Sequence, residues 1–388
     1  LYERTFLLGV TEARSDNLGL VFSHSLQGTL SGRPNQFTLG LAPAHEIEHS
    51  ANYRNNDGVI DRNRKTAQAL TRGINFPVFF ENNFSPADHV SLLAGGQFVW
   101  IDRNFEDRFR TDADGNQSAR QIFRTFNPKL GFVYQHTPQD QIFFNVSRSF
   151  QPPSFDDLNP FESGTNGSTI YVPLQAQHSW SMEAGTRGGR GNLEWDVTWY
   201  HAWVRNELFE INDLTGRDIG TANVPRTRHT GVEMGLDWEI FGPRTSRHAS
   251  HRLTLRQEFT RNDFRFDHDP VYGTNRIAGV PVNLYEAELM FRTRQGFYAG
   301  ANLEWSVTSF AADHANSVKV DPSAISGLKI GYKGGRYSVF CDLRNLADRR
   351  YVAMVKPIGD ARTASPDDLA IFAPGAGRSF FAGASFEW

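Results

Sequence analysis

Apolar and polar residues alternate along many segments of this chain. In residues 232–240 every second side chain is large and apolar, and the positions between hold glycine or an acidic residue. Side chains of a β-strand point alternately to its two faces, so this segment has one apolar and one polar face. Residues 193–199 and 297–307 repeat the pattern, which predicts further strands of the same kind.

The connections between these segments alternate in length. Short ones such as 31–34 and 188–192 are separated by long polar ones such as 44–68, 150–176 and 206–225. Short turns on one rim and long loops on the other are typical of outer-membrane β-barrels, whose long loops lie outside the cell. We therefore predict an all-β, antiparallel transmembrane β-barrel with about 16 strands in this chain. The predicted strands are 2–10, 17–30, 35–43, 70–83, 89–103, 123–136, 139–149, 177–188, 192–205, 226–241, 251–262, 281–292, 296–307, 325–333, 336–347 and 377–388.

The way the chain would cross a membrane follows from its apolar runs. No run approaches the roughly 20 apolar residues of a membrane helix. A closed barrel is the other structure that satisfies every backbone group in lipid. Aromatic residues make up 13% of the chain, which suits the girdles of such a barrel. Trp195 and Trp203 share one face about 26 Å apart, and they either occupy the two girdles or are two tryptophans of one apolar face.

The alternation also predicts which side chains face lipid. We expect the apolar set to point outward and the charged set to point into the barrel, because a lumen holds water. The outward set includes Phe380, Phe386, Trp195, Val232 and Met234, and the inward set Glu194, Asp237, Glu304 and Glu387.

Composition limits the other classes of function. The formal net charge of −3 indicates no nucleic-acid partner, and the single Cys341 excludes an intrachain disulfide framework. No spacing of nucleophile, base and orienting group identifies a catalytic set, so we predict neither an enzyme nor a cofactor. His45 and His49 match H-E-x-x-H, but on a strand they would lie about 13 Å apart, too far for one metal ion. They are weak candidates for a metal-binding loop and otherwise solvated residues.

Several segments resemble TonB-dependent outer-membrane receptors. The Arg148-containing stretch resembles that family's strand entering a large extracellular loop, and the stretch beginning at Arg344 its penultimate strand. The order and spacing of these pieces carry the resemblance more than any single one. The similar segments are 144–155, 177–185, 206–208 with Asn223 and 230–233, 279–281, 344–351 and 374–388.

The resemblance implies a parent barrel of about 22 strands closed by an N-terminal plug, with a segment that contacts the energy-coupling protein TonB. We find neither plug nor coupling segment in the sequence and interpret residues 1–388 as the C-terminal portion of the barrel. The family's role implies an outer-membrane location, contact with lipid, a monomer, and high-affinity uptake of a scarce extracellular ligand. A ferric siderophore is the expected ligand. Haem, cobalamin, a copper chelate or another small cofactor, and a passive porin of about 16 strands, remain alternatives.

Residues beside the loop after residue 149 are the candidate ligand site. Arginine and aromatic side chains suit an anionic, conjugated ligand through charge, hydrogen bonds and stacking. The alternative is that they are ordinary solvated residues of the loop and rim. The candidates are Arg148, Phe150, Gln151, Phe155, Tyr171 and Arg205.

Overall fold

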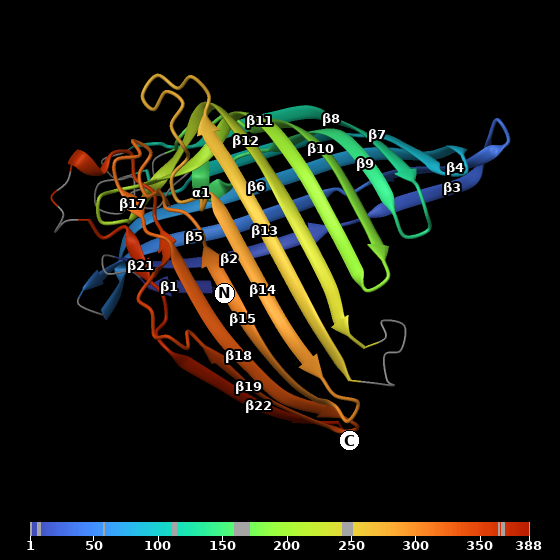
Figure 1. The fold of residues 1–388 in the computed structure, drawn as a ribbon. Helices are drawn as coiled ribbons and strands as arrows, with labels where there is room; N and C mark the ends of the chain where they lie inside the picture. The colour runs from blue at the N-terminus through green and yellow to red at the C-terminus, as the bar shows by residue number, and fades with distance from the viewer. Residues whose placement is uncertain are drawn as a thin grey trace.

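The chain folds into one curved antiparallel sheet (Figure 1). The computed structural model describes residues 2–5, 9–56, 59–110, 115–158, 171–242, 251–363, 365 and 369–387. The strands of the sheet are β1 Tyr2–Thr5, β2 Gly9–Gly19, β3 Phe22–Leu30, β4 Arg33–Leu41, β5 Ala44–Asn56, β6 Val59–Ala87, β7 Val90–Asp107, β8 Ala119–Gln135, β9 Gln141–Gln151, β10 Gln177–Arg190, β11 Leu193–Asn212, β12 Asp218–Phe241, β13 Arg252–Phe266, β14 Asn283–Arg292, β15 Phe297–Ser306, β18 Ser323–Gly334, β19 Tyr337–Arg344 and β22 Ser379–Phe386.

The smaller elements all lie in long connections. They are α1 Phe155–Leu158, β16 Phe310–Ala311, β17 Lys319–Val320, β20 Val352–Val355, η2 Ala361–Thr363 and β21 Phe372–Pro374. None of the helices in the described part of the chain is long and apolar enough to span a membrane.

Two of the long strands are interrupted, which reconciles 18 segments with the predicted number. β2 and β3 are separated by residues 20–21, and β4 and β5 by Ala42 and Pro43. β6 continues past the break at Ala42 and Pro43, because it pairs first with β5 and then with β4. Counted as continuous strands, the 18 segments amount to about 16, as the alternation predicted.

The boundaries of several strands were predicted wrongly. The expected loop at 44–68 is largely ladder, since β5 runs to Asn56 and β6 begins at Val59. The expected loop at 206–225 is a hairpin in which β11 and β12 remain paired to Asn212 and Asp218. The predicted strand at 2–10 is also divided between β1 and β2. Strands that project beyond the apolar band lose their alternation but keep their hydrogen bonds, which explains the first two errors.

The sheet has one apolar and one polar face, and the register fixes which residues share them. Met234 lies opposite Val197 and Phe259, and Asp237 lies opposite Glu194 and Arg256. The apolar face is left exposed; Met234, for example, is 45% exposed. This confirms the predicted division between an apolar face and a charged one.

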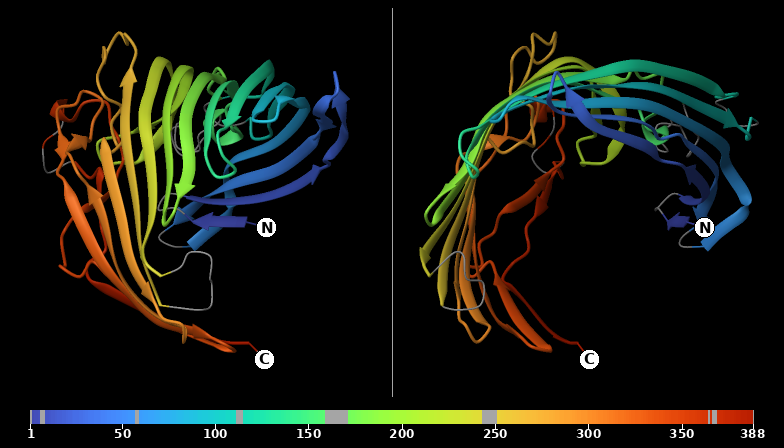
Figure 2. Two further views of the ribbon diagram at one scale, coloured as in Figure 1. Left: turned by 45° about the vertical axis from the view of Figure 1, so that its right-hand side comes forward. Right: turned by 90° about the vertical axis from the view of Figure 1, so that its right-hand side faces the viewer.

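The sheet is an open trough (Figure 2). β22 pairs with β19, and in the described residues no ladder joins it to β1, β2 or β3. Short turns gather at one rim, where the C-terminus also lies, and long connections at the other (Figure 1). The Ser31-Gly32 turn illustrates the short type, with positive φ at both residues, the geometry that matches the twist of a tight hairpin.

Candidate functional site

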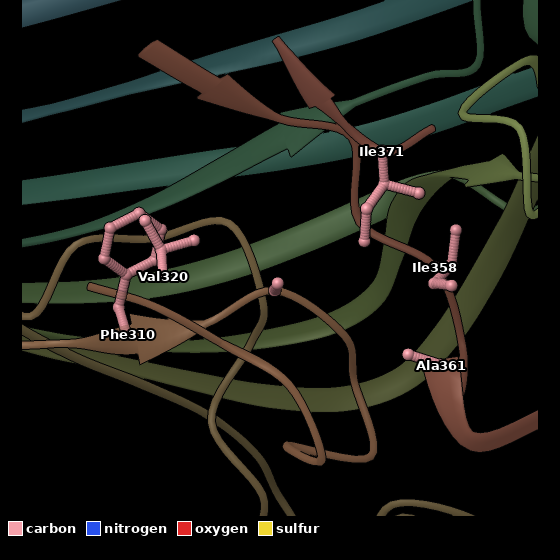
Figure 3. Close-up of a cluster of buried hydrophobic side chains, with 6 residues drawn as sticks. Phe310, Val320, Ile358, Ala361 and Ile371 are labelled. Atoms are coloured by element: carbon pink, nitrogen blue, oxygen red, sulfur yellow. The ribbon is translucent and has the colours of Figure 1, made fainter. Parts of the chain in front are cut away.

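The long connections between β11 and β22 pack into one folded unit. We call this unit the loop lobe; it comprises the turn 213–217 and the described parts of 267–282, 307–322 and 345–378. Apolar side chains from two of these connections form its core (Figure 3). The buried members are Phe310, Ala312, Val320, Ile358, Ala361 and Ile371. The lobe therefore has a core of its own, away from the ladders of the sheet.

Asp313 joins two connections of the loop lobe at a single carboxylate. It is fully buried. Its oxygens accept hydrogen bonds from the backbone N–H groups of Ser317 at 2.8 Å, Val318 at 3.0 Å and Ala361 at 3.0 Å. The Ser317 hydroxyl donates a fourth. A buried carboxylate is tolerated only when it is hydrogen-bonded in this way, so Asp313 fixes 313–318 against η2.

His314 lies next to Asp313 in an aromatic pocket. Its ring is 5.4 Å from that of Phe209, 5.2 Å from Phe266 and 5.5 Å from Tyr272, measured between centroids. Burial is the main cause that lowers the pKa of His314 to about 4. The imidazole is therefore neutral near pH 7, and its Nδ1 accepts from the Ala278 backbone N–H at 3.4 Å.

Two asparagines dock the segment 171–177 onto the β11–β12 hairpin. Asn223 accepts from the Gln175 backbone N–H at 2.7 Å and donates to the Gln175 carbonyl at 2.9 Å. The Asn206 side chain donates to Gln175 Oε1 at 2.8 Å. Asn206 also has a φ of 52°, a conformation that asparagine adopts more readily than most residues. These are residues on which the family resemblance rests, and their role here is structural.

Phe155 and Tyr171 contact Arg103 and Gln121, which lie directly opposite each other on the inner face of β7 and β8 near the long-loop rim. The Arg103 guanidinium lies over the Phe155 ring, 5.4 Å from its centroid. The Tyr171 hydroxyl donates to Gln121 Oε1 at 2.9 Å. Burial raises the pKa of Tyr171. Two of the predicted site residues therefore stand near the mouth of the trough, with Arg103 as a partner that the sequence did not identify.

Arg148 and Phe150 do not project into a loop. Both lie on β9, where Arg148 is opposite Trp180 and Phe150 opposite His178. The Arg148 guanidinium donates to the Phe126 carbonyl at 2.7 Å, beyond the point where the β8–β9 ladder ends.

Arg205 and Gln151 are also strand residues. Arg205 lies on β11, two positions beyond Trp203 and on the same exposed apolar face, opposite Arg226. Gln151 pairs with Gln177 at the end of the β9–β10 ladder. The six predicted residues thus occupy different faces of the sheet and do not form one surface; their role in ligand binding stays a prediction.

His45 and His49 lie on β5 and not in a loop. They are opposite Ile74 and Leu70 of β6, so they share a face four residues apart, about 13 Å along the strand. In the described residues no three or more potential metal ligands gather.

The inner wall carries paired charges and a hollow that the sequence did not localise. Asp237 binds Arg256 at 2.8 Å, and Glu288 binds Lys329 at 2.8 Å. Beside the short-turn rim the wall has an open hollow of about 860 Å³, lined in part by Glu194, Asp237 and Arg256. Cations and carboxylates on adjacent inward positions explain how so many acidic residues share one face.

The chain matches the family described as TonB dependent receptor-like, beta-barrel, over residues 3–346. It belongs to this family. Solved structures of similar fold include the ferric-catecholate import receptor Fiu from E. coli K12, with a TM-score of 0.69 and 15% identity over 97% of this chain and 55% of that one. The ferric yersiniabactin uptake receptor FyuA from Yersinia pestis gives 0.69 and 14% over 100% and 56%. The copper transporter OprC gives 0.75 and 13% over 98% and 57%.

The family assigns this TonB-dependent receptor barrel to the outer membrane, and its apolar face to lipid. Its relatives are transport receptors and not enzymes. The match also favours a receptor over the passive porin considered from the sequence. The chain spans a little over half the length of the structures it resembles, and at these identities the likeness shows the fold alone.

Proposed function

We propose that this chain forms part of the barrel of a receptor that imports a ferric siderophore across the outer membrane, driven through TonB. By their names, Fiu is a ferric-catecholate import receptor, FyuA is a ferric yersiniabactin uptake receptor and OprC is a copper transporter. The names of these three structures favour a conjugated, anionic metal chelate as the class of ligand. Haem, cobalamin and copper chelates are the competitors that the experiment below includes.

The observation that carries the proposal is the group formed by Arg103, Phe155 and Tyr171. It combines a guanidinium and two aromatic rings on the inner side of the sheet, near the long-loop rim. Aromatic rings stack on conjugated ligands, and arginine pairs with their anionic oxygens. Neighbouring segments hold the group in place, since Asp157 of α1 accepts from Thr221 of β12 at 2.7 Å. A preorganised site loses little entropy when a ligand binds.

We further propose that other strands of the same receptor close the trough, and that its plug and TonB contact lie outside this chain. An open sheet edge in lipid would leave backbone N–H and C=O groups unpaired, which costs several kcal/mol for each group. β22 and β3 each have one such edge in the described structure. The fraction of each relative that this chain covers supports the same proposal.

Uptake by cells that lack competing receptors tests the function. Cells producing the full-length receptor are given radiolabelled ferric siderophores of catecholate and carboxylate type, with haem, cobalamin and a copper chelate as competitors. Phe155→Ala and Tyr171→Ala should each lower binding about tenfold, because one lost stacking or hydrogen-bond contact is worth about 1–1.5 kcal/mol.

Controls separate binding from assembly and from passive entry. Phe297→Ala removes an exposed ring beside a short turn at the opposite rim and should leave uptake unchanged. Receptor abundance in the membrane is measured in parallel. Uptake that persists in cells without TonB would refute coupled transport, and wild-type binding by both loop variants would refute this site.

A further inference from the structure

Arginine and tryptophan residues form a continuous cross-strand row on the outward face. Trp180 of β10 lies opposite Trp203 of β11, and Trp203 lies opposite Arg228 of β12. One step nearer the long-loop rim, Arg205 lies directly opposite Arg226. We call Arg205, Arg226 and Arg228 with these two tryptophans the arginine–tryptophan patch.

The patch stands where the apolar band of the outward face ends. Trp180 and Trp203 are 45% and 48% exposed, as expected for rings that contact lipid. On β12 the outward positions below the patch include Val232 and Met234, whereas those within it are Arg226 and Arg228. Tryptophan is enriched at the level of lipid headgroups. The three arginines therefore lie at headgroup depth, on the long-loop side of the membrane.

The positive charge of the patch is not neutralised by the protein. Arg205 and Arg226 are exposed and directly opposite each other, an arrangement of like charges that destabilises a ladder. The nearby acid Asp263 is already paired with Arg265 at 2.8 Å and with Arg276 at 3.1 Å. Across the described residues, no carboxylate lies within ion-pair distance of any of the three arginines of the patch. An anion from outside the protein would relieve their repulsion.

We propose that the arginine–tryptophan patch binds the phosphate groups of the phosphorylated, acylated glycolipid of the outer leaflet, a molecule of the lipid A type. Guanidinium groups bind phosphate in a bidentate manner, which fits two or three arginines around one headgroup. The acyl chains would lie along the apolar face below, where Val232 and Met234 project. This inference rests on the fold and the outer-membrane location, and not on the proposed cargo.

The patch also explains the position of Arg205, which the sequence suggested for capture of a soluble ligand. Its side chain lies on the face of Trp203 and not on that of Phe155 or Tyr171. A residue on the outward face is reached from the membrane and not from the mouth of the barrel. We therefore assign Arg205 to lipid binding. In this assignment lipid binds on the outward face, and the extracellular ligand binds on the inner face.

Lipid binding by the purified full-length receptor tests the proposal. The test variant carries Arg205→Gln, Arg226→Gln and Arg228→Gln, and native mass spectrometry counts bound lipid A. The matched control carries Arg190→Gln, Arg294→Gln and Arg336→Gln, three exposed arginines at or beside the short turns of the opposite rim. We expect the test variant to lose at least about tenfold in lipid A affinity and the control to match the wild type.

The nature of the ligand is tested with related probes. Lipid A without its phosphates should bind at least about tenfold more weakly to the wild type, and inorganic phosphate should not compete. Equal binding of both lipids, or equal loss in test and control variants, would overturn the proposal. Competition by inorganic phosphate would show a free-anion site instead. Should the triple variant fail to fold, Arg205→Gln and Arg226→Gln singly must each weaken lipid A binding, because each removes one exposed charge and its repulsion.

Discussion

Removing the Asp313 carboxylate should open the loop lobe without unfolding the barrel. In Asp313→Ala the backbone N–H groups of Ser317, Val318 and Ala361 lose their acceptor. A buried donor without a partner costs about 1–3 kcal/mol, so three cost about 3–9 kcal/mol if the lobe stays closed. When the lobe opens, water can hydrogen-bond to these N–H groups, so the cost falls mainly on the closed state. We expect the local opening free energy to fall by at least about 3 kcal/mol, which is roughly a hundredfold in an equilibrium constant.

Amide hydrogen exchange, followed by mass spectrometry in detergent, measures this change directly. Peptides covering 313–320 and 356–363 should exchange about a hundredfold faster, and peptides of β12 and β13 should not change. Asp313→Asn keeps one acceptor oxygen and should give an intermediate rate.

The matched control for this prediction is Asp360→Asn. Its carboxylate pairs with Arg362 at 2.6 Å at the surface of the same loop, and within the described residues it has no hydrogen-bond partner in another connection. Exchange in the lobe should then stay at the wild-type rate. Wild-type protection of 356–363 in Asp313→Ala would refute the reasoning, since it would mean that the two connections hold together without the shared carboxylate.

The strands within the membrane could be predicted because lipid imposes the alternation. Residues such as Met234 and Phe380 contact hydrocarbon on one face while water and paired charges occupy the other, and the sequence records that difference. Beyond the apolar band both faces are polar. The ladder of β5 from Ala44 to Asn56 therefore persists without leaving a period-2 pattern, and the sequence indicated a loop.

The face on which each candidate residue lies could not be predicted from the sequence, because proximity to a long connection does not decide the face. Arg148 and Arg205 both lie near long connections, as predicted, yet the register places each beside an outward tryptophan. For Arg205 the signal was present, since it has the same parity as Trp195 and Trp203 on β11. Arg103, which lies over Phe155, gives no such signal, because contact between α1 and β7 depends on how the connection folds back.

The loop lobe could not be derived from periodicity. Its core joins Phe310, Ile358 and Ile371, which are separated by up to about 60 residues and belong to connections without regular alternation. Asp313 is an acidic residue in a polar segment, which predicts exposure, but it is fully buried. Such contacts are set by the sheet, which brings the ends of β13, β15 and β19 to one rim and so places these connections side by side.

Two further predictions test the membrane face and the aromatic pocket. Met234→Arg, near the middle of the outward face, should destabilise the barrel by about 2–4 kcal/mol in urea unfolding from vesicles. Thr198→Arg, on the inner face opposite Glu233, should change the free energy of unfolding only slightly. Equal losses of stability in the two variants would contradict the assignment of outward and inward faces. For His314, the pKa of about 4 in the folded lobe lies below the ordinary 6.5. The opened lobe therefore binds the proton more tightly than the folded lobe does. The contribution of His314 to lobe stability is complete above about pH 6.5 and declines toward pH 4, by up to about 3 kcal/mol. Amide exchange in 275–280 and 313–320 should accelerate as the pH falls over that range in the wild type. His314→Phe cannot take up a proton and should remove this pH dependence of exchange. An unchanged pH dependence in the variant would assign it to another group.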